Sequence, residues 1–595
     1  MCGIVGYIGH RLAQPVLLNS LGKLEYRGYD SCGIAVAERS LEVTKAVGRV
    51  VELSRLVAKG SATAGIGHTR WATHGAVTTA NAHPHIDCRG RIAVVHNGII
   101  ENYLELRAAL ERDGHRFVSE TDTEVLPHLI EKYYREGRLE EAVGLAVKCL
   151  VGSYAIIVIA AGSKSLVAAR RDSPLVIGLG DRENFVASDV SAMLDYTDRV
   201  VYLEDGDICR VTADDVFIAN SGTTVSRKVQ VVPWTAEQVQ KGGYEHFMLK
   251  EIHEQPKAVS ETLAGRISVI EPAVTLDIEA PANPRNIVLT ACGSSYHAAL
   301  IGELLLTRLA RVRARAVIAS EFEQVEPTLD SDWVIAITQS GETADTLRAT
   351  KKARAAGCAT LAVVNVQGST ATRLCDDTLF VRAGPEVSVA ATKTFIAQVV
   401  AMYLLALSRG TIDRKAETDL INELKLIPAY LSRLLDRESD IAQHGAYLAR
   451  FTDIFFVARG INYPVALEGA LKTKEISYVH AEAHPAGELK HGPFALLGPN
   501  MPVVALAPKD ETYSLMQSSM KEIKARGSPV IAVVDEGDSD MEQVADYVIK
   551  VPAVQPLLSP ILNTVVVQLI SYYIAKTRGC PIDRPANLAK SVTVL

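Results

Sequence analysis

Short apolar runs separated by glycine-containing turns fill the first 232 residues of the chain. Runs of this length and composition, bounded by turn residues, are typical of strands. The runs that predict strands are Ile92–Val95, Tyr154–Ala160, Leu166–Ala169 and Val200–Leu203. Apolar residues at helical spacing predict one amphipathic helix over Asn102–Arg112. This part of the chain is therefore expected to form a domain rich in β-structure.

The pattern changes at residues 233–246, which contain Pro233-Trp234, a polar stretch and Gly242-Gly243. Because proline and paired glycines interrupt regular structure, we predict a linker here and a helix that begins near Tyr244. Beyond the linker, apolar strands alternate with helices. In order, strand first, these segments are Asn286–Ala291, Ser295–Leu309, Trp333–Thr338, Ala344–Ala356 and Leu361–Asn365. Such an alternation predicts a doubly wound parallel sheet.

The same order of strands and helices occurs a second time. The second series is Asp453–Ala458, Pro464–Tyr478, Pro502–Ala507, Thr512–Ala525 and Val530–Val534. Internal repetition of this kind indicates one structural unit used twice. We therefore expect an α/β multi-domain protein. Its predicted parts are a β-rich domain at 1–232, a linker at 233–246, and two similar doubly wound α/β domains at 247–430 and 431–595.

Composition narrows the class of protein. The chain of 595 residues is 48% hydrophobic and 22% charged, which is globular composition, and its net charge of −7 argues against general nucleic-acid binding. Uncharged stretches such as Thr564–Ala575 are shorter than the ~18 residues that cross a membrane, and the first residues do not resemble a secretory signal. The nine cysteines, an odd number, show no paired metal spacing. We expect reduced thiols in a cytoplasmic enzyme that binds neither nucleic acid nor membranes.

Cys2 is a candidate nucleophile at the start of the chain. Removal of Met1 would leave Cys2 with a free α-amino group. An α-amino group has a pKa of ~7.7–8.0, so it is partly neutral at pH 7 and can accept the thiol proton. One residue would then supply both nucleophile and base. Taken alone, Cys2 is more simply explained as a small residue entering a strand.

Three other segments of the same region carry groups suited to an amino-acid amide. His96-Asn97-Gly98 follows a strand and offers a side-chain amide and a backbone N–H for an oxyanion hole. Arg70 has the fork geometry that binds a carboxylate, and Glu120–Glu124 offers a carboxylate for an ammonium group. Each segment taken alone also fits a helix cap, a surface ion pair or a packed loop.

Together with Leu24–Ser31, these motifs resemble the class II glutamine amidotransferase family, in the family's order and from Cys2 to about Val231. The resemblance implies a four-layer αββα domain of the N-terminal-nucleophile type, a fold that periodicity alone does not predict. It also implies that Cys2 attacks the side-chain amide of glutamine. The other implied site residues are Asn97 and Gly98 for the oxyanion, Arg70, Thr73 and Asp122 for the glutamine, and Trp71 as a gate on the ammonia path.

Two hydroxyl-rich junctions between strand and helix predict a phosphate site in the first α/β series. They are Cys292–Ser295 and Thr338–Thr343. Helix N-termini carry free N–H groups and positive partial charge, which attract anions. Serine and threonine are also the commonest helix caps, but two such junctions at adjacent strand ends favour phosphate binding. The equivalent loop of the second series, Ala507–Thr512, contains proline and acidic residues, so we expect phosphate only in the first.

The second series offers a charged helix side. Glu468, Lys472 and Glu475 lie along one side of the predicted helix. A solvated, ion-paired stripe is the usual meaning of this pattern. The small apolar residues around it favour instead a packed helix, in which a carboxylate with a raised pKa could move a proton. Farther on, the loop Gly487–Pro493 places His491 among glycines.

These segments and the terminal Asn587–Val594 resemble sugar isomerase (SIS) domains, from about Tyr244 to the end of the chain. The implied sugar-phosphate contacts are Gly293, Ser294, Ser295, Thr338, Gln339, Ser340, Thr343 and Val389. In the implied reaction, Glu475 moves a proton between sugar C1 and C2 beside Lys472 and Glu468. His491 assists ring opening, and Lys590 forms an imine with the open-chain ketose.

Together the two resemblances imply an enzyme that uses glutamine and fructose 6-phosphate to make glutamate and glucosamine 6-phosphate, without a metal or organic cofactor, as a homodimer. Two other classes stay open. Another class II amidotransferase would need an acidic pyrophosphate-binding loop or a Ser-Gly-Gly-x-Asp-Ser ATP loop, and neither follows residue 244. A non-catalytic sugar-phosphate sensor would have no use for Cys2.

His480 and His484 have helical i, i+4 spacing, but their context is not that of a zinc protease.

Overall fold

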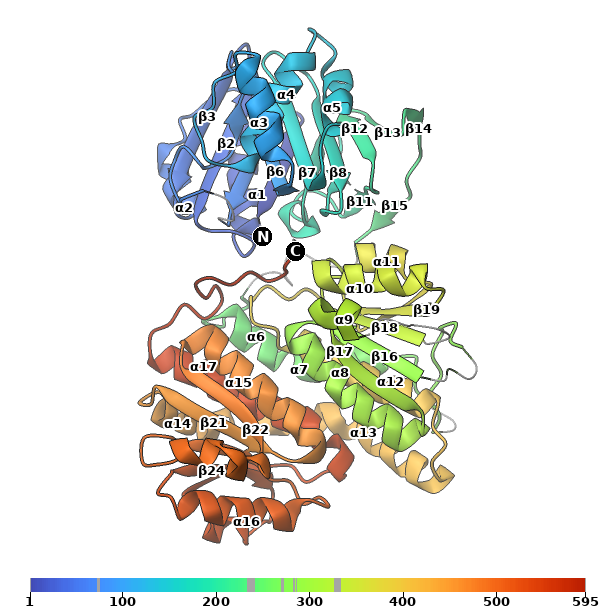
Figure 1. The fold of residues 1–595 in the computed structure, drawn as a ribbon, viewed down its shortest axis with the longest axis vertical. Coiled ribbons are helices and arrows are strands. Elements are labelled where there is room, and N and C mark those ends of the chain that lie inside the picture. The colour runs from blue at the N-terminus through green and yellow to red at the C-terminus, as the bar shows by residue number, and fades with distance from the viewer. Residues whose placement is uncertain are drawn as a thin grey trace. The chain divides into compact units, whose positions relative to one another are not determined.

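A computed structural model shows the fold of the chain (Figure 1). It describes residues 2–71, 75–232, 241–268, 272–281, 284, 286–325 and 333–593. The contacts divide these residues into two compact units: 2–232 together with 589–593, and 241–588. Most of the predicted linker lies outside the described residues. The tail from residue 589, which we expected to end the second α/β domain, groups with the first unit.

The first unit contains two antiparallel sheets. The eight-stranded sheet has the order β15-β11-β9-β10-β1-β4-β2-β3 and the seven-stranded sheet the order β14-β13-β12-β8-β7-β6-β5. The strands of the first sheet are β1 (Gly3–Ile8), β2 (Ser31–Ala37), β3 (Leu41–Val47), β4 (Ala64–Arg70), β9 (Val176–Leu179), β10 (Asn184–Ala187), β11 (Arg199–Tyr202) and β15 (Val229–Val231). Those of the second are β5 (His85–Ile86), β6 (Ile92–Ile100), β7 (Gly152–Ala160), β8 (Leu166–Arg171), β12 (Asp207–Val211), β13 (Val216–Asn220) and β14 (Thr223–Thr224).

Helices cover the outer face of each sheet. They are α1 (Ala13–Leu24) and α2 (Val50–Leu56) on the first sheet, and α3 (Tyr103–Arg112), the 3-10 turn η1 (Asp122–Glu124), α4 (Val125–Tyr133) and α5 (Leu139–Val147) on the second (Figure 1). Strand alternation fixes the layers: on β1, Ile4 and Ile8 pack against the second sheet, whereas Val5 and Tyr7 pack with α1. The four-layer αββα arrangement is thereby confirmed.

The second unit contains two parallel five-stranded sheets. Their strands are β16 (Asn286–Ala291), β17 (Arg313–Ile318), β18 (Trp333–Thr338), β19 (Ala359–Val364) and β20 (Asp377–Phe380), then β21 (Asp453–Ala458), β22 (His480–Pro485), β23 (Val503–Leu506), β24 (Val530–Asp535) and β25 (Tyr547–Val551). The orders, β17-β16-β18-β19-β20 and β22-β21-β23-β24-β25, are the same. The predicted repeat of a doubly wound unit is confirmed.

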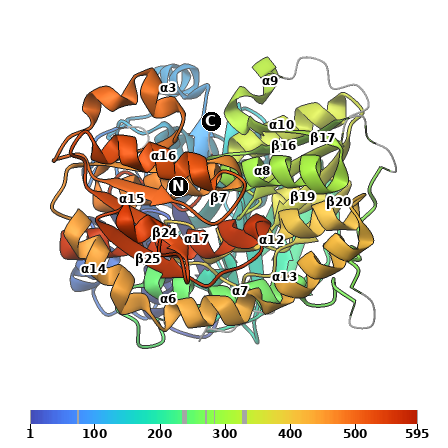
Figure 2. The ribbon, with the colours of Figure 1, turned by 90° about the horizontal axis from the view of Figure 1, so that it is seen from below.

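Helices pack on both faces of these sheets. They are α6 (Phe247–His253), α7 (Gln255–Leu263), α8 (Gly293–Leu305), α9 (Phe322–Val325), α10 (Ala344–Ala355), α11 (Thr370–Leu374), α12 (Lys393–Ser408), α13 (Arg414–Leu435), α14 (Glu438–Leu448), α15 (Tyr463–Ser477), α16 (Tyr513–Lys524) and α17 (Ser559–Thr577), with a 3-10 turn η7 (Glu488–His491). Figure 2 shows α7 and α13 side by side along this unit. One continuous apolar core runs from the parallel sheet β16–β20 through α8, α12, α15 and α17 to the parallel sheet β21–β25.

Two sequence expectations need correction here. The uncharged stretch around Thr564–Ala575 is longer than we expected: the helix Pro556–Thr577 is long and apolar enough to cross a membrane by length and composition. However, 89% of its apolar window is buried inside the protein, so it is a core helix. The segment containing His480 and His484 is the strand β22, and helical spacing does not apply to it.

Candidate functional site

Cys2 lies directly before β1, where strand pairing brings two other segments to it. β1 pairs with β4, so Trp71, which follows β4, comes close, and its backbone N–H donates to Cys2 Sγ at 3.3 Å. From the second sheet, the Asn97 side-chain amide donates to the Cys2 carbonyl oxygen at 2.8 Å. The predicted nucleophile and the predicted oxyanion donor are therefore neighbours.

The charge environment of the thiol is mixed. Burial raises the pKa of the Cys2 thiol, and the Trp71 amide and the Arg70 guanidinium partly oppose that rise. The Asp122 carboxylate acts in the same direction as burial. A thiol of this kind needs a nearby base to become a nucleophile. The α-amino group that we expect to be this base is created by removal of Met1, which lies outside the described residues.

Asn97 and Gly98 lie on β6, and a side chain at residue 98 would not fit there. The two residues pair with Ala155 and Tyr154 of β7. Gly98 has φ +129°, and a Cβ there would lie 2.1 Å from the Ser153 carbonyl oxygen. Glycine is therefore required at this position.

Two further predicted glutamine-site residues, Arg70 and Asp122, are buried in the same unit. Arg70 ends β4 and donates to the carbonyl oxygens of Gly75 and Ala76 at 3.1 and 3.2 Å. Asp122 lies in η1, where its Oδ2 accepts the Ile100 N–H at 2.8 Å. Thr73 lies outside the described residues.

Residues of the Leu24–Ser31 segment contact the backbone of this site. A Cβ at Gly28 would lie 2.7 Å from the Arg70 carbonyl carbon and 2.8 Å from the Trp71 nitrogen, so glycine permits the close approach of the two backbones. Arg27 Nε donates to the Cys2 carbonyl oxygen at 3.4 Å, and its Nη1 pairs with Asp189 at 3.0 Å. These contacts give a physical reason for the motif.

In the second unit, the two hydroxyl-rich junctions lie at neighbouring strand ends. Gly293, Ser294 and Ser295 begin α8 after β16. Thr338 ends β18, and Gln339, Ser340 and Thr343 lie in the loop that follows it. β16 has β17 on one side and β18 on the other, so the strand order reverses there. Ligands of doubly wound sheets bind in the crevice at this switch point, beyond the carboxyl ends of the strands.

Hydroxyl groups of the loop after β18 form hydrogen bonds within the loop. Thr338 Oγ1 and Thr343 Oγ1 are 2.9 Å apart, and Ser340 Oγ accepts the Glu342 N–H at 3.1 Å. Gly341 has φ +70°, and a Cβ there would lie 2.0 Å from Ser369 Oγ. The loop therefore depends on glycine for its shape, as a close anion cradle does.

Glu468 and Lys472 of α15 are buried and Glu475 is partly buried, which excludes a solvated stripe. Glu468 is 0% and Lys472 1% exposed, and Lys472 Nζ lies 2.5 Å from Glu475 Oε2 and 3.5 Å from Glu468 Oε1. Ser294 Oγ and His297 Nδ1 of α8 bond to the same Glu468 carboxylate at 2.9 and 2.7 Å. The α15 charges and the first switch-point junction thus form one hydrogen-bonded group.

The pKa of Glu468 is lowered, contrary to the raised value that we expected of a carboxylate on this helix. Burial alone would raise it, but the Lys472 ammonium and the His297 hydrogen bond outweigh burial. Burial lowers the pKa of Lys472, yet the carboxylates of Glu468 and Glu475 outweigh that effect and leave it raised. Sequence reasoning missed His297, which lies one helical turn after Ser294.

The other predicted sugar-site residues are more dispersed. Ser295 Oγ donates to Gln398 at 3.1 Å, and the Val389 N–H donates to the Asp583 carbonyl oxygen at 3.1 Å. His491 ends η7 and is exposed, and the structure does not bring it to the α15 group. Lys590 belongs to the first unit.

Metal-binding side chains also gather in the described part of the chain, at a place that sequence spacing did not indicate. The group is Cys88, His115, His128 and Glu131. It includes none of the residues around Cys2 or Glu468. The expectation of no metal considered ligands close in sequence, and these four come from three separate segments.

Comparison with known proteins agrees with this architecture. A glutamine amidotransferase domain model matches residues 68–195, and a SIS domain model matches residues 282–408 and 447–578. The fold and the site therefore define a glutamine amidotransferase joined to two SIS domains. Glutamine–fructose-6-phosphate aminotransferases [isomerizing] of Thermus thermophilus and Methanosarcina acetivorans are 48% and 47% identical to this chain, each over 100% of both chains.

A solved structure matches the second unit. The C-terminal domain of glucosamine-fructose-6-phosphate aminotransferase from Francisella tularensis is 36% identical, with a TM-score of 0.55, and covers 58% of this chain and 100% of its own. With relatives of this identity over its full length, the chain belongs to the glutamine–fructose-6-phosphate aminotransferase (isomerizing) family.

Proposed function

We propose that this chain converts L-glutamine and D-fructose 6-phosphate to L-glutamate and D-glucosamine 6-phosphate, the entry reaction of amino-sugar synthesis. The observation that carries the proposal is the hydrogen bond from the Asn97 amide to the Cys2 main chain, in a chain that aligns over its full length with enzymes of this name. The proposed roles of the other residues follow from their positions around these atoms.

In the first half of the reaction, Cys2 is the nucleophile. With Met1 removed, its α-amino group takes the thiol proton, and the sulfur attacks the glutamine side-chain carbonyl. Asn97 Nδ2 and the Gly98 N–H stabilise the oxyanion, ammonia leaves, and water hydrolyses the thioester to glutamate. Arg70 and Asp122 bind the α-carboxylate and α-amino groups, with Thr73 beside them.

The ammonia must reach the sugar without entering water, because in neutral water it becomes ammonium and loses its nucleophilic electron pair. Trp71 is the proposed gate. Its backbone N–H donates to the Cys2 sulfur, so the proposed gate lies directly beside the thiol where ammonia is released.

In the second half, the switch-point junctions hold the sugar phosphate through Ser295, Gln339, Ser340 and Thr343, with Gly293, Ser294, Thr338 and Val389 shaping the pocket. Lys590 forms an imine with C2 of the open-chain ketose, and ammonia replaces the lysine nitrogen. Glu475 then moves a proton from C1 to C2, which gives the aldose. Lys472 and Glu468 hold Glu475 in place and fix its charge environment.

Ring opening of the sugar is assigned to His491. Because His491 is exposed in one chain, we assign it to the site of a second copy in a homodimer. No metal or organic cofactor takes part in either half of the proposed reaction, and the enzyme is assigned to the cytoplasm. A sugar-phosphate sensor is disfavoured because it would not need the Cys2 and Asn97 arrangement.

The proposal is tested by following the nitrogen atom. The protein is incubated with fructose 6-phosphate, glutamine labelled with ¹⁵N in its side-chain amide, and excess unlabelled ammonium. We expect glucosamine 6-phosphate that carries ¹⁵N, as measured by mass spectrometry. Unlabelled product would contradict internal transfer, and the absence of amino sugar with both donors present would contradict the proposed function.

A further inference from the structure

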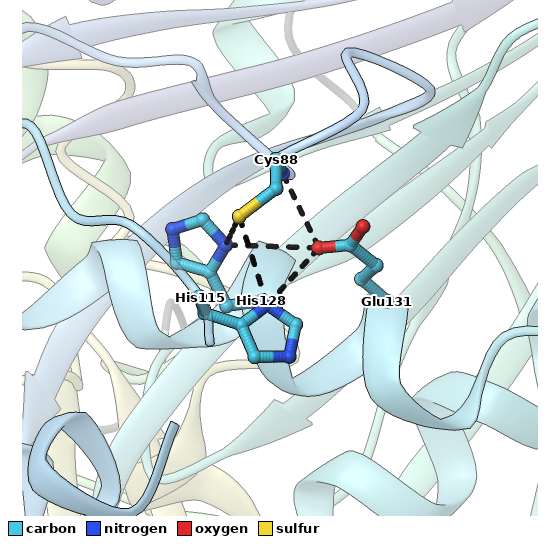
Figure 3. Close-up of side chains that lie close together, drawn as sticks. All are labelled: Cys88, His115, His128 and Glu131. Carbon is cyan, nitrogen blue, oxygen red and sulfur yellow. Dashed lines mark hydrogen bonds and ion pairs between the residues drawn. The ribbon is translucent and has the colours of Figure 1, made fainter. Parts of the chain in front are cut away.

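Four side chains that commonly bind metal ions meet in the first unit (Figure 3). Cys88 lies in the turn between β5 and β6, His115 follows α3, and His128 and Glu131 lie one turn apart on α4. One ligand atom from each residue lies within 4.8 Å of the other three. Three segments that are separate in the sequence are therefore joined at one point.

Four of the six distances between these atoms are close to those of a tetrahedral metal site, and the other two are within 4.8 Å. Cys88 Sγ lies 3.7 Å from His115 Nδ1 and 3.5 Å from His128 Nδ1. Glu131 Oε2 lies 3.1 Å from His115 Nδ1 and 3.9 Å from His128 Nδ1. Ligand atoms ~2.0–2.3 Å from a zinc ion at tetrahedral angles are roughly 3.3–3.6 Å apart. A zinc ion therefore fits among the four atoms with small adjustments.

Neighbouring groups favour metal binding by two of the four side chains, His128 and Cys88. His128 is 1% exposed, and its Nε2, buried without a hydrogen-bond partner, lies 3.7 Å from Glu124 Oε1. A carboxylate there favours the tautomer with the proton on Nε2, which leaves Nδ1 free to bind metal. The backbone N–H of Arg116 donates to Cys88 Sγ at 3.3 Å, and such a bond stabilises a thiolate.

We propose that Cys88, His115, His128 and Glu131 bind one zinc ion with a structural role. A thiolate with two imidazoles favours zinc over the hard cations Mg²⁺ and Ca²⁺. Four protein ligands complete a tetrahedron and leave no position for a catalytic water. On binding, the Cys88 thiol releases its proton to solvent.

The position of the ion explains what it would stabilise. It joins the turn before β6, the segment after α3, and α4. β6 carries Asn97, and η1, which leads into α4, carries Asp122. Zinc would thus hold together the elements on which the predicted glutamine site is built, without contacting glutamine. This inference does not depend on the proposed function.

The test is the metal content of the full-length protein, purified without chelators from zinc-supplemented cells. We expect one zinc per wild-type chain by inductively coupled plasma mass spectrometry, and a large loss in C88S and in E131Q. C149S, which changes another partly exposed thiol of the same unit, is the matched control and keeps its zinc. Removal of zinc from the wild type with a chelator is expected to lower its melting temperature.

Cobalt provides a second readout, which the wild type alone can give. Wild-type apoprotein reloaded with Co²⁺ is expected to show the strong visible absorption of tetrahedral cobalt and a thiolate-to-cobalt charge-transfer band. C88S should lack the charge-transfer band, and C149S should retain it. The proposal would be overturned by wild-type protein that lacks stoichiometric zinc or holds stoichiometric iron in its place. It would also be overturned if the zinc content were unchanged in both C88S and E131Q.

Discussion

At the residue scale, the position of Cys2 results from contacts with residues distant in the sequence. Trp71 reaches its sulfur through the pairing of β1 with β4, and Asn97 reaches its carbonyl oxygen from the other sheet. The oxyanion role of Asn97 needs an amide N–H fixed in direction before the substrate arrives. The requirement for glycine at 98 and the pairing of β6 with β7 supply that fixed direction.

This geometry predicts the effect of removing the Asn97 amide. In N97A, one oxyanion donor is lost, and we expect glutaminase kcat to fall by ~10²–10³-fold with a smaller change in KM for glutamine. The measurement is steady-state glutamate release. N102A is the matched control, because Asn102 bonds to the Cys149 carbonyl oxygen, outside the Cys2 site, and should leave kcat unchanged. A normal kcat in N97A would remove Asn97 from the catalytic assignment.

Lys472 is the second residue whose environment predicts a measurable effect. In K472M, the buried Glu468 carboxylate loses its lysine partner, and loss of one partner of a buried ion pair costs ~3–5 kcal/mol. We expect the free energy of unfolding of the second unit to fall by about that amount in denaturant titrations followed by Trp333 fluorescence, with Trp71 and Trp234 replaced by phenylalanine.

K474M is the control on the same helix, because Lys474 is exposed, and it should change stability by less than ~0.5 kcal/mol. The double variant E468L/K472M removes both buried charges and is expected to recover most of the lost stability. If the double variant is as unstable as K472M, packing and not the unpaired carboxylate is responsible.

The residues that sequence reasoning found share one property: their chemistry is visible in a short motif. Cys2, Asn97 and the α15 charges stand in recognisable local patterns, whereas His297 takes its meaning from a carboxylate 171 positions away. Cys88 and His128 likewise come together only through the fold. The pKa of Glu468 is lowered mainly by Lys472, which stands in the same local pattern, and further by His297, which only the fold brings to it.

At the scale of elements, several apolar strands were predictable to the residue. The strand predicted at Ile92–Val95 was too short: β6 extends to Ile100, so Asn97 and Gly98 lie within it and do not follow it. β16, β18 and β21 have the predicted bounds, because each is a largely buried apolar run with polar or glycine residues near its ends. The missed strand β17 is at a sheet edge, where Arg313 and Arg315 alternate with apolar residues and reduce its hydrophobicity. The missed helix α12 is apolar on all sides and has little helical periodicity to detect.

Four histidines on or next to strands β4, β5 and β6 form a buried cluster that makes stability depend on pH. His68, His83, His85 and His96 are buried together, with the rings of His68 and His83 stacked at 3.9 Å. Burial lowers the pKa of each, that of His68 to about 3. In the unfolded chain histidine titrates near ~6.5, so below that pH the unfolded state binds more protons. Stability is therefore complete above pH ~6.5 and decreases as the pH falls toward the folded-state pKa values.

We expect the free energy of unfolding of the first unit, and with it the urea midpoint, to drop steadily between about pH 7 and about pH 5, the free energy by up to ~1.4 kcal/mol per pH unit for each histidine. Trp71 fluorescence in W234F/W333F reports this unit. H83N should flatten the dependence, whereas H10N, at an exposed ring, should not. A midpoint that stays constant or rises on acidification would contradict the burial of neutral histidines.

At the scale of the whole molecule, the chain combines two kinds of architecture. The first unit is a sandwich of antiparallel sheets, and the second repeats one parallel strand order twice. The repeat was visible in the sequence because each buried strand and helix leaves its own hydrophobic pattern. The four layers were not, because local alternation does not say which sheet faces which, and that assignment came from family resemblance.

The central claim is that nitrogen released by the Cys2 thiol is captured by a phosphorylated ketose bound to the same protein. The most direct test compares glutamine and ammonium as nitrogen donors for glucosamine 6-phosphate synthesis in the wild type, C2A and the control C149A. We expect C2A to lose synthesis from glutamine and to keep synthesis from ammonium, while C149A keeps both. Glutamine-dependent synthesis by C2A at the wild-type rate would contradict the claim.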